Sequence, residues 1–409
     1  MTQEVTVVFH PLNKVVSVPR GTNLLAAFRE AGVQIESICG GKGECGKCRV
    51  IIDKGEYAER AHTHKKHLTE KERALGYRLA CEISVTGNLE VTVPVESRIE
   101  RPQILIGLGM GQDAGEINPS VVIYPLQISA DPGLPFSGRS IRLSGYRGPR
   151  PQIPDAIYRK IQASEAPLKA ILTHTNGYPE IIDAAGEDDV PTVYGIALDL
   201  GTTTVVGTLI DLATGCVLAQ DATLNRQITY GEEVITRIAF GRRPEGLALL
   251  QQAAVESINR VVESITASAG IRPADAVECC IGGNTVMNHL LTGTDPGYLE
   301  LADADVSRRP FIRKARALGI GLHPEAYCYC LPNVSRFVGG DAVGDVLTSG
   351  LHLQPEISLL IDLGTNGEII IGNRDWIASA SCASGPAFEG AGISAGMRAM
   401  RGAIERVEI

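Results

Sequence analysis

The chain has 409 residues, of which 44% are hydrophobic and 21% charged, and its formal net charge at pH 7 is −9. This length exceeds what one hydrophobic core usually organises, so two to four domains are expected. The acidic balance, the lack of a signal-peptide pattern and the lack of an apolar run of about 18 residues predict a cytoplasmic protein without a nucleic-acid or membrane partner.

The first 96 residues predict a small mixed sheet wrapped around one helix. Two β-branched runs, at 4–11 and 14–20, are typical of a hairpin. A helix is expected over 21–32, with Thr22 as its N-cap and Gly32 as its stop. The rest of this region is predicted to form a strand, a short helix and a closing strand, at 48–55, 68–76 and 87–94.

Three of the ten cysteines lie in one short loop, "CGGKGECGKC". Five residues separate Cys39 from Cys45, two separate Cys45 from Cys48, and Cys81 follows after 32 more. In a reducing cytosol, clustered cysteines indicate metal more often than disulfides. A zinc ribbon needs two C-x2-C pairs, whereas a 2Fe–2S cluster takes three ligands from one loop and a fourth from a distance. The spacing therefore favours a cluster, with a zinc site or a disulfide knot as the alternative.

Glycines fill much of the loop between these cysteines. Gly40, Gly41, Gly43 and Gly46 let the backbone wrap closely around a compact inorganic core, and their amides can point at sulfur. The region resembles a 2Fe–2S ferredoxin domain of the β-grasp type, in the adrenodoxin-like branch that has five residues between its first two cysteines. The resemblance implies that all four cysteines named above bind the cluster.

The remaining cysteines and a histidine-rich loop are expected to be structural. Six cysteines are predicted to be inert core residues: Cys216, Cys279, Cys280, Cys328, Cys330 and Cys382. The loop "AHTHKKH" contains His62, His64 and His67, for which a solvated basic loop is favoured over a metal site.

The middle of the chain offers little chemistry. Residues 97–117 contain "IGLGMGQDAG", which lacks a clear strand before it and helix after it, and are interpreted as a linker. Residues 118–190 are predicted to form a small α/β domain. Its expected elements are strands at 121–129 and 139–145, a helix over 154–174 and an acidic break at 186–191.

One sequence design occurs twice in the rest of the chain. In "YGIALDLGTTTVVGTLIDLATG" and "SLLIDLGTNGEIIIGNRDW", a hydrophobic run ends in Asp-Leu-Gly-Thr and a second run follows a tight turn. The two aspartates are Asp199 and Asp362, and two copies at this separation argue for two equivalent lobes. Glycine lets such a turn approach phosphate, neighbouring side chains and amides donate hydrogen bonds, and the aspartate can hold Mg²⁺ through water. The turn residues with this expected role are Gly201, Thr202, Thr203, Gly364, Thr365 and Asn366.

The paired motifs resemble the two phosphate loops of the actin, sugar-kinase and heat-shock ATPase superfamily, which implies ATP and Mg²⁺ as ligands. That family has a connecting helix with small residues and a carboxylate near its start. "VGGDAVGDVL" suits this role, with Gly339, Gly340 and Asp341 at its beginning. Asp341 is therefore expected to position the attacking water, to act as an N-cap, or both.

Two further segments lie near these motifs. In "CCIGGNTVMNHLLTG", Asn284 and Thr285 follow a glycine turn, and helix capping is favoured over ligand contact. The glycine- and alanine-rich segment 381–405 allows close backbone approach in or beside the cleft.

An iron–sulfur domain joined to an actin-like ATPase resembles the reductive activators of corrinoid proteins. The motifs that carry this resemblance span nearly the whole chain: "CGGKGECGKC", "RLACE", "DLGTTTV", "GGNTVMNHLL", "LPNVSRFVGGDAVGD", "DLGTNGEI" and "SCASGPAFEGAGI". It implies that an upstream low-potential donor reduces the cluster, and that one electron then converts cobalt(II) of a partner corrinoid protein to cobalt(I) for methyl transfer. Low-potential 2Fe–2S centres have reduction potentials of about −400 mV. Reduction of cobalt(II) to cobalt(I) in a corrinoid needs a still lower potential, so ATP is expected to assist it.

The predicted fold class is α+β and α/β multidomain. The expected parts are a β-grasp 2Fe–2S ferredoxin domain at 1–96, a linker at 97–117, a small α/β middle domain at 118–190, and an actin-like (ribonuclease H-like) ATPase domain at 191–409 with its second lobe from about 357. The family's second lobe extends beyond the length present here, so the chain is expected to be truncated. An incomplete lobe would expose a sheet edge, which favours association, for instance as a homodimer.

Two other functions stay open on this evidence. The chain could be a 2Fe–2S electron-transfer protein that uses a non-catalytic, partial actin-like lobe for docking. It could instead be an ATP-gated reductant for another low-potential target, like the dehydratase activators, although their cluster lies between subunits and not in a separate ferredoxin domain.

Overall fold

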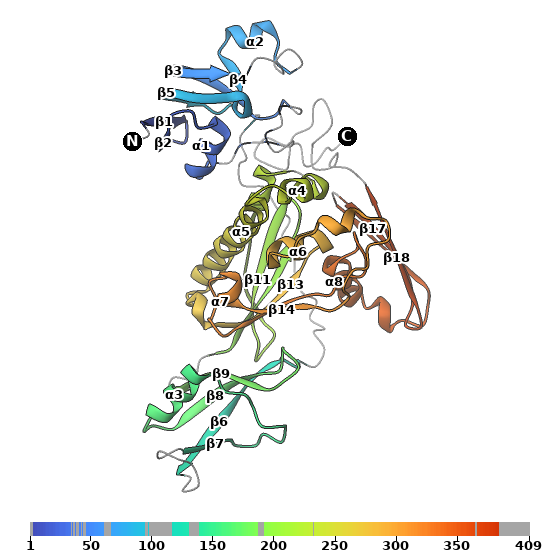
Figure 1. Cartoon of the computed structure of the whole chain (residues 1–409). Coiled ribbons are helices and arrows are strands. Elements are labelled where there is room, and N and C mark those ends of the chain that lie inside the picture. Colours follow the sequence, from blue (N-terminus) through green and yellow to red (C-terminus); the bar gives the residue numbers. More distant parts are fainter. Residues whose placement is uncertain are drawn as a thin grey trace, which may run out of the picture.

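The computed structural model describes residues 3–33, 35, 37, 41, 43, 46–60, 67–94, 97, 117–130, 139–186, 192–231, 233–364 and 366–383. In chain order they form an N-terminal sheet, a middle sheet, a six-stranded sheet and a C-terminal sheet. Figure 1 shows the N-terminal sheet beyond one end of the six-stranded sheet and the middle sheet beyond the other. In these ranges, no helix is long and apolar enough to cross a membrane.

The N-terminal sheet has the strand order β2-β1-β5-β3-β4, with β1 and β5 parallel. Its elements are β1 (Glu4–His10), β2 (Lys14–Pro19), α1 (Leu24–Glu30), β3 (Arg49–Glu59), α2 (Glu70–Ala74), β4 (Tyr77–Leu79), η2 (Ala80–Glu82) and β5 (Ile83–Thr92). The predicted hairpin, helices and later strands are confirmed. Their core includes Phe9 on β1 and Phe28 on α1, whose ring centroids lie 4.2 Å apart.

The predicted N-cap of α1 is wrong by one residue. Asn23 holds this position, because its side-chain oxygen accepts the N–H of Leu25 at 3.0 Å. Its Nδ2 group also donates to the carbonyl of Cys81 at 2.8 Å, so it joins the helix to η2. The Thr22 hydroxyl donates to Pro19 instead, at 2.6 Å.

The middle sheet has the order β7-β6-β8-β9. Its elements are β6 (Val121–Ala130), β7 (Arg139–Leu143), α3 (Asp155–Ala163), β8 (Leu168–Thr173) and β9 (Glu180–Gly186). The helix predicted over 154–174 is wrong in its second half, because Ser164 is extended and the chain continues as β8. Pro167 lacks the N–H that a helix needs, and β8 pairs with strands on both sides.

The six-stranded sheet has the order β12-β11-β10-β13-β15-β14. Its strands are β10 (Tyr194–Leu200), β11 (Thr204–Asp211), β12 (Val217–Leu224), β13 (Ala276–Gly282), β14 (Phe311–Lys314) and β15 (Tyr327–Cys330). The helical elements beside it include η4 (Arg226–Thr229), α4 (Val234–Gly241), α5 (Gly246–Ala269) and α6 (Thr285–Thr292). The long α5 packs on β11 and β12 and supplies buried Leu250, Ile258 and Ile265 to the largest core (Figure 1).

Two carboxylates attach the middle sheet to the six-stranded sheet. The Ser120 and Thr175 hydroxyls both donate to Glu278 on β13. Glu180 on β9 accepts from Lys314 at 2.7 Å and from the Tyr327 hydroxyl at 2.5 Å. Burial, together with Glu180, raises the pKa of Tyr327 to about 12, so the phenol stays protonated as a donor.

The C-terminal sheet is an antiparallel meander of β16 (Ser358–Leu363), β17 (Asn366–Gly372) and β18 (Ile377–Ala383). It follows α8 (Gly340–Ser349), which corresponds to the expected connecting helix. Ile370 on one face packs with Val338, just before α8, and with Ala342 of α8. The other face carries large apolar side chains that are exposed: Leu359, Ile361, Leu363, Ile369 and Ile371.

Half of the cysteines expected in the core are exposed. Cys279, Cys328 and Cys330 are buried as predicted, whereas Cys216, Cys280 and Cys382 are exposed. Successive side chains of a strand point to opposite faces, so Cys280 cannot share the buried face of Cys279 on β13.

Candidate functional site

The described part of the cysteine loop lies next to the distant fourth cysteine. Cys48 precedes β3 and Cys81 lies in η2, and both side chains are buried. The N–H of Ala80 donates to the carbonyl of Cys48 at 2.8 Å. A Cβ atom placed on Gly41 would come within 3.9 Å of Cys81 Cβ, so the loop passes beside Cys81. Cys39 and Cys45 lie outside the described residues.

The loop backbone requires glycine. Gly41, Gly43 and Gly46 have φ angles of 89°, 81° and 67°, a conformation that residues with side chains rarely adopt. At Gly46, a Cβ atom would also meet the His67 side chain at 2.7 Å. This tight loop beside two buried cysteines fits a compact inorganic cluster. His67 packs inside this region, while Gly40, His62 and His64 lie outside the described residues.

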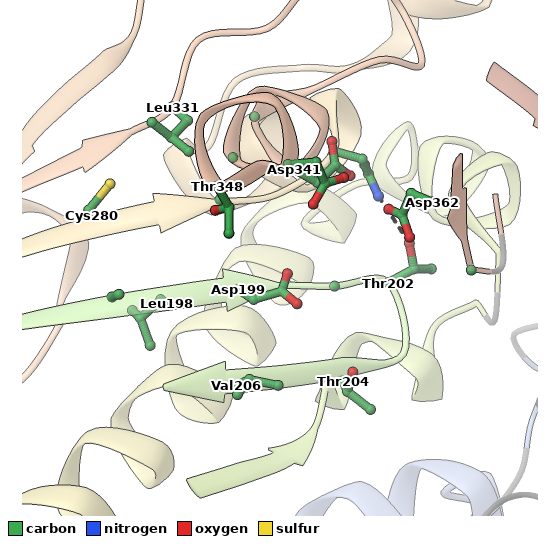
Figure 2. A pocket seen from close by; sticks show the side chains of 18 of the residues that line it. Leu198, Asp199, Thr202, Thr204, Val206, Cys280, Leu331, Asp341, Thr348 and Asp362 are labelled. Carbon is green, nitrogen blue, oxygen red and sulfur yellow. Dashed lines mark hydrogen bonds between the residues drawn. The ribbon is translucent and has the colours of Figure 1, made fainter. Parts of the chain in front are cut away.

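The two Asp-Leu-Gly turns face one cavity of about 730 Å³. Figure 2 shows Asp199, Asp341 and Asp362 reaching it from β10, α8 and β16. The predicted site residues that line the cavity are Asp199, Gly201, Thr202, Thr203, Gly340, Asp341, Asp362 and Gly364. Thr365 and the side chain of Asn366 are outside the described part of the structure.

Gly339 has a packing role and does not line the cavity. It is the N-cap residue of α8, and a Cβ atom there would lie 2.4 Å from the amide nitrogen of Thr285. Gly339 therefore lets the first turns of α8 and α6 meet. Asp341 lies inside the first turn of α8, so its alternative interpretation as the N-cap is wrong; its carboxylate accepts the N–H of Ala342 at 2.8 Å.

Asn284 caps α6, as predicted, and also lines the cavity. Its Oδ1 atom accepts the N–H of Met287 at 3.0 Å, and its Nδ2 group donates to Thr202 Oγ1 at 3.0 Å. The Thr285 hydroxyl turns away and donates to the carbonyl of Ser335 at 2.6 Å. Asn284 thus couples the end of β13 to the first phosphate-loop candidate.

Two acidic residues of the cavity were missed by the sequence analysis, Asp345 and Glu368. Asp345 lies one helical turn after Asp341 on α8, and Glu368 pairs with Asp362 across the β16–β17 hairpin. Both positions follow from local geometry once the aspartates are chosen, because i and i+4 share a helix face and hairpin partners lie side by side.

The cavity carboxylates share an acidic environment that disfavours their charges. Desolvation and the neighbouring Asp341 and Asp362 raise the pKa of Asp199 to about 6. Desolvation and nearby carboxylates raise the pKa of Asp345 to about 6 and that of Glu368 to about 7. A divalent cation would offset this repulsion. Among the described residues, no group of three or more His, Cys, Asp or Glu side chains has the geometry of a direct metal site.

The sequence analysis also missed the residues behind the first turn. Asn225 and Arg237 are fully buried. Asn225 Nδ2 donates to the carbonyl of Gly201 at 2.8 Å, and Arg237 Nη2 donates to that of Thr202 at 2.5 Å. Because C=O and the following N–H point in opposite directions in a trans peptide, these bonds turn the amides of Thr202 and Thr203 away from the two donors.

Comparison with known proteins covers nearly the whole chain. Family models match a 2Fe–2S iron–sulfur cluster binding domain at 8–86, the RACo middle region at 194–354, and the C-terminal ASKHA domain of RACo at 356–409. Corrinoid activation enzyme RamQ of Eubacterium limosum is 31% identical over 427 aligned positions, which cover 98% of this chain and 65% of RamQ. The [Co(II) methylated amine-specific corrinoid protein] reductase of Methanosarcina barkeri is 32% identical over 222 positions, 52% of this chain and 40% of the reductase.

One solved structure matches over 99% of this chain and 67% of its own length. It is a reductive activator for corrinoid, iron–sulfur protein, with 31% identity and a TM-score of 0.62. The predicted fold class is confirmed, and the chain carries a 2Fe–2S domain. It spans about two thirds of the length of the RamQ relative. The chain belongs to the family of reductive activators of corrinoid proteins.

Proposed function

We propose that this chain acts in the ATP-dependent reductive activation of a corrinoid protein, in which one electron from a 2Fe–2S cluster returns cobalt(II) to cobalt(I) for methyl transfer. The observation that carries the proposal is the cavity between two Asp-Leu-Gly turns, on the same chain as a glycine loop beside Cys81. RamQ and the Methanosarcina reductase, by their names, act on corrinoid proteins, which supports the assignment.

The cluster ligands in this proposal are Cys39, Cys45, Cys48 and Cys81. Burial of Cys48 and Cys81 supports it, because a cluster shielded from water keeps its electron for a specific partner. The positive φ angles of the loop glycines place amide groups where a compact core can be wrapped. When bound, the cluster supplies a store for one electron.

The nucleotide proposed for the cavity is ATP with Mg²⁺. The Gly201–Thr203 turn offers amide groups and hydroxyls to phosphate, and Gly364 and Gly340 allow backbone approach from the other side. Asp199 and Asp362 are proposed to hold Mg²⁺ through water, and Asp341 to position the attacking water. The raised pKa of Asp199 supports this, because a cavity that disfavours negative charge gains most from a cation.

ATP has a physical role in this scheme, because electron transfer to a corrinoid cobalt(II) from a centre with a reduction potential of about −400 mV is uphill. A ligand shifts such an equilibrium only through its different affinities for two states of the protein. The cavity is lined by residues of β10, α8 and β16, so a relative movement of these elements would change its shape and its affinity for nucleotide.

The remaining assignments are proposals that follow from the family. The partners are a corrinoid protein and an upstream low-potential electron donor, in the cytoplasm. We place the domain boundaries at 96, 117 and 190, which fall between the sheets. The exposed apolar face of the C-terminal sheet supports association, including a homodimer.

The test is an anaerobic activation assay. The reconstituted chain, a reductant, Mg²⁺-ATP and a cobalt(II) corrinoid protein are mixed, and cobalt(I) is followed by its visible absorption. Cobalt(I) should form only when the cluster is present, and nucleotide should raise its yield. A normally reducible cluster with no nucleotide binding would favour an electron-transfer protein with a docking lobe instead.

A further inference from the structure

The N-terminal sheet contacts the six-stranded lobe through the last turn of α1. Arg29 Nη2 donates to the carbonyl of Thr229 at 2.9 Å, and its guanidinium carbon lies 4.5 Å from the centre of the Tyr230 ring. Burial lowers the pKa of Arg29, which Tyr230 partly offsets and Arg243 reinforces, and this is consistent with a contact that excludes water. The Tyr230 ring is in turn fixed against Phe240, with 4.8 Å between centroids.

The segment that receives Arg29 is the same one that holds the phosphate-loop candidate from behind. Asn225 caps η4, and its backbone N–H and its side chain donate to the carbonyls of Thr203 and Gly201, both at 2.8 Å. Arg237 donates to Thr202 and also to Gly231, the residue after Tyr230, at 2.8 Å. The turn and the Arg29 contact are therefore opposite ends of one buried polar network.

Gln227 ties the two donors of this network together. Its Oε1 atom accepts from Arg237 Nη1 at 3.1 Å and from Asn225 Nδ2 at 3.2 Å, and its own amide donates to Leu250 at 2.9 Å. Gln227, Asn225 and Arg237 are all fully buried. Buried networks whose members are satisfied are rigid, so a shift at one end is transmitted and not absorbed.

Helix α1 extends this connection to the cysteine loop. Asn23 at its N-terminus donates to the carbonyl of Cys81, and Leu25 lies against Gly41, where a Cβ atom would be 3.3 Å away. Arg29 lies in the last turn of the same seven-residue helix. A helix of this length spans about 10 Å, so α1 links Gly41 and Cys81 to the Arg29 contact over a short distance.

We propose that the Arg29–Thr229/Tyr230 contact is an intramolecular docking surface for the ferredoxin domain, coupled through Asn225 and Arg237 to phosphate binding at the 201–203 turn. The coupling free energy favours the two events together, so docking and phosphate binding should strengthen each other. Docking orders η4 and so orders the donors that fix the turn, and nucleotide that orders the turn stabilises docking in return. This inference rests on the proposed function only in taking the ligand of the turn to be nucleotide phosphate.

The experiment measures hydrogen exchange of the full cluster-containing chain with and without Mg²⁺ and a non-hydrolysable ATP analogue. The analogue should slow amide exchange at the 201–203 turn, in η4 and in α1. In Arg29→Ala, saturating analogue should still protect the turn but no longer α1. By calorimetry, the dissociation constant of the analogue should rise about fivefold or more, the low end of ordinary coupling.

Matched variants separate docking from general damage. Arg20→Ala removes an exposed arginine of the same sheet, which bonds Gln3, and should behave as wild type. Tyr230→Phe keeps the ring under Arg29 and should retain the coupling, whereas Tyr230→Ala should lose it. The visible spectrum of each variant verifies that the cluster is intact.

The outcomes distinguish the two proposals. Wild-type affinity and an unchanged α1 response in Arg29→Ala would overturn the docking inference. So would protection of the turn in the wild type with no change in α1, and this result would leave the nucleotide site standing. If the analogue changed hydrogen exchange at no amide and gave no heat of binding, both the nucleotide site and the docking inference would be overturned.

Discussion

Asp345 on α8 lines the same cavity as Asp362 at the end of β16, and desolvation together with the nearby Asp362 carboxylate raises the pKa of Asp345 to about 6. It lies in a cavity where Asp199 and Glu368 also have raised pKa values. These carboxyl groups therefore bind protons at higher pH than ordinary carboxyl groups do, and a cation bound among them would favour their ionised form.

The free energy of unfolding of the nucleotide-free chain should fall as pH rises from 6.5 to 8, a range above the ordinary pKa of histidine, where the lowered pKa of buried His289 has little effect. In the unfolded chain, carboxyl groups titrate near about 4, whereas Asp199 and Glu368 titrate at about 6 and about 7 in the fold. Between these values the folded state binds more protons, so raising the pH favours unfolding. The urea midpoint at the two pH values measures the loss.

Glu368→Gln should reduce this pH-dependent loss, because glutamine keeps a partner for Ser381 without a titrating proton. Glu263→Gln, on the exposed side of α5, should show the same loss as wild type. Equal losses in Glu368→Gln and wild type would contradict the assignment.

Asp199→Asn should weaken Mg²⁺-ATP binding by about tenfold or more, or about 1.4 kcal/mol, because a cation attracted by the carboxylates loses one of them. The same change removes a repulsive charge from among the cavity carboxylates, so the nucleotide-free protein should be at least as stable as wild type. Calorimetry and urea unfolding measure the two effects. Wild-type affinity in Asp199→Asn would show that this carboxylate does not face the cation.

Two substitutions of Asn284 should separate its role as the cap of α6 from its contact with Thr202. Asn284→Ala loses both and should lower the free energy of unfolding by about 1 kcal/mol. Asn284→Ser keeps a capping hydroxyl but is too short to hold Thr202, so it should fold with nearly wild-type stability and bind nucleotide more weakly. If serine restored both properties, the Thr202 contact would have no role in binding.

Cys81→Ser should abolish the 2Fe–2S visible spectrum and lower the iron and sulfide content, while Cys216→Ser, at an exposed position, should leave them unchanged. Iron and sulfide analysis after anaerobic reconstitution measures both. A zinc content near one per chain in the wild type would instead support the alternative of a zinc site.

Sequence patterns were sufficient to predict those parts of the site whose residues are neighbours in the chain. Each Asp-Leu-Gly turn joins two hydrophobic runs that pair as a hairpin, and such a pattern is visible in the sequence. The positions of Asp345 and Glu368 follow from equally local rules, so both could have been predicted from the sequence. Asn225 and Arg237 were not, because only folding brings η4 and α4 behind the 201–203 turn.

The errors have physical causes of the same kind. Residues 154–174 contain helical spacing, but Pro167 and pairing on both sides make the second half a central strand, and such pairing is a property of the whole sheet. Cys280 was assigned to the core from its apolar neighbours, although strand alternation places it on the face opposite Cys279.

The most direct test measures the yield of cobalt(I) on a corrinoid protein at a fixed reductant potential of about −400 mV. The yield is compared with and without Mg²⁺-ATP, in wild type and in Asp199→Asn. The account predicts that nucleotide raises the yield in the wild type and that Asp199→Asn, with an intact cluster spectrum, loses most of that increase. Equal yields with and without nucleotide in the wild type would contradict it.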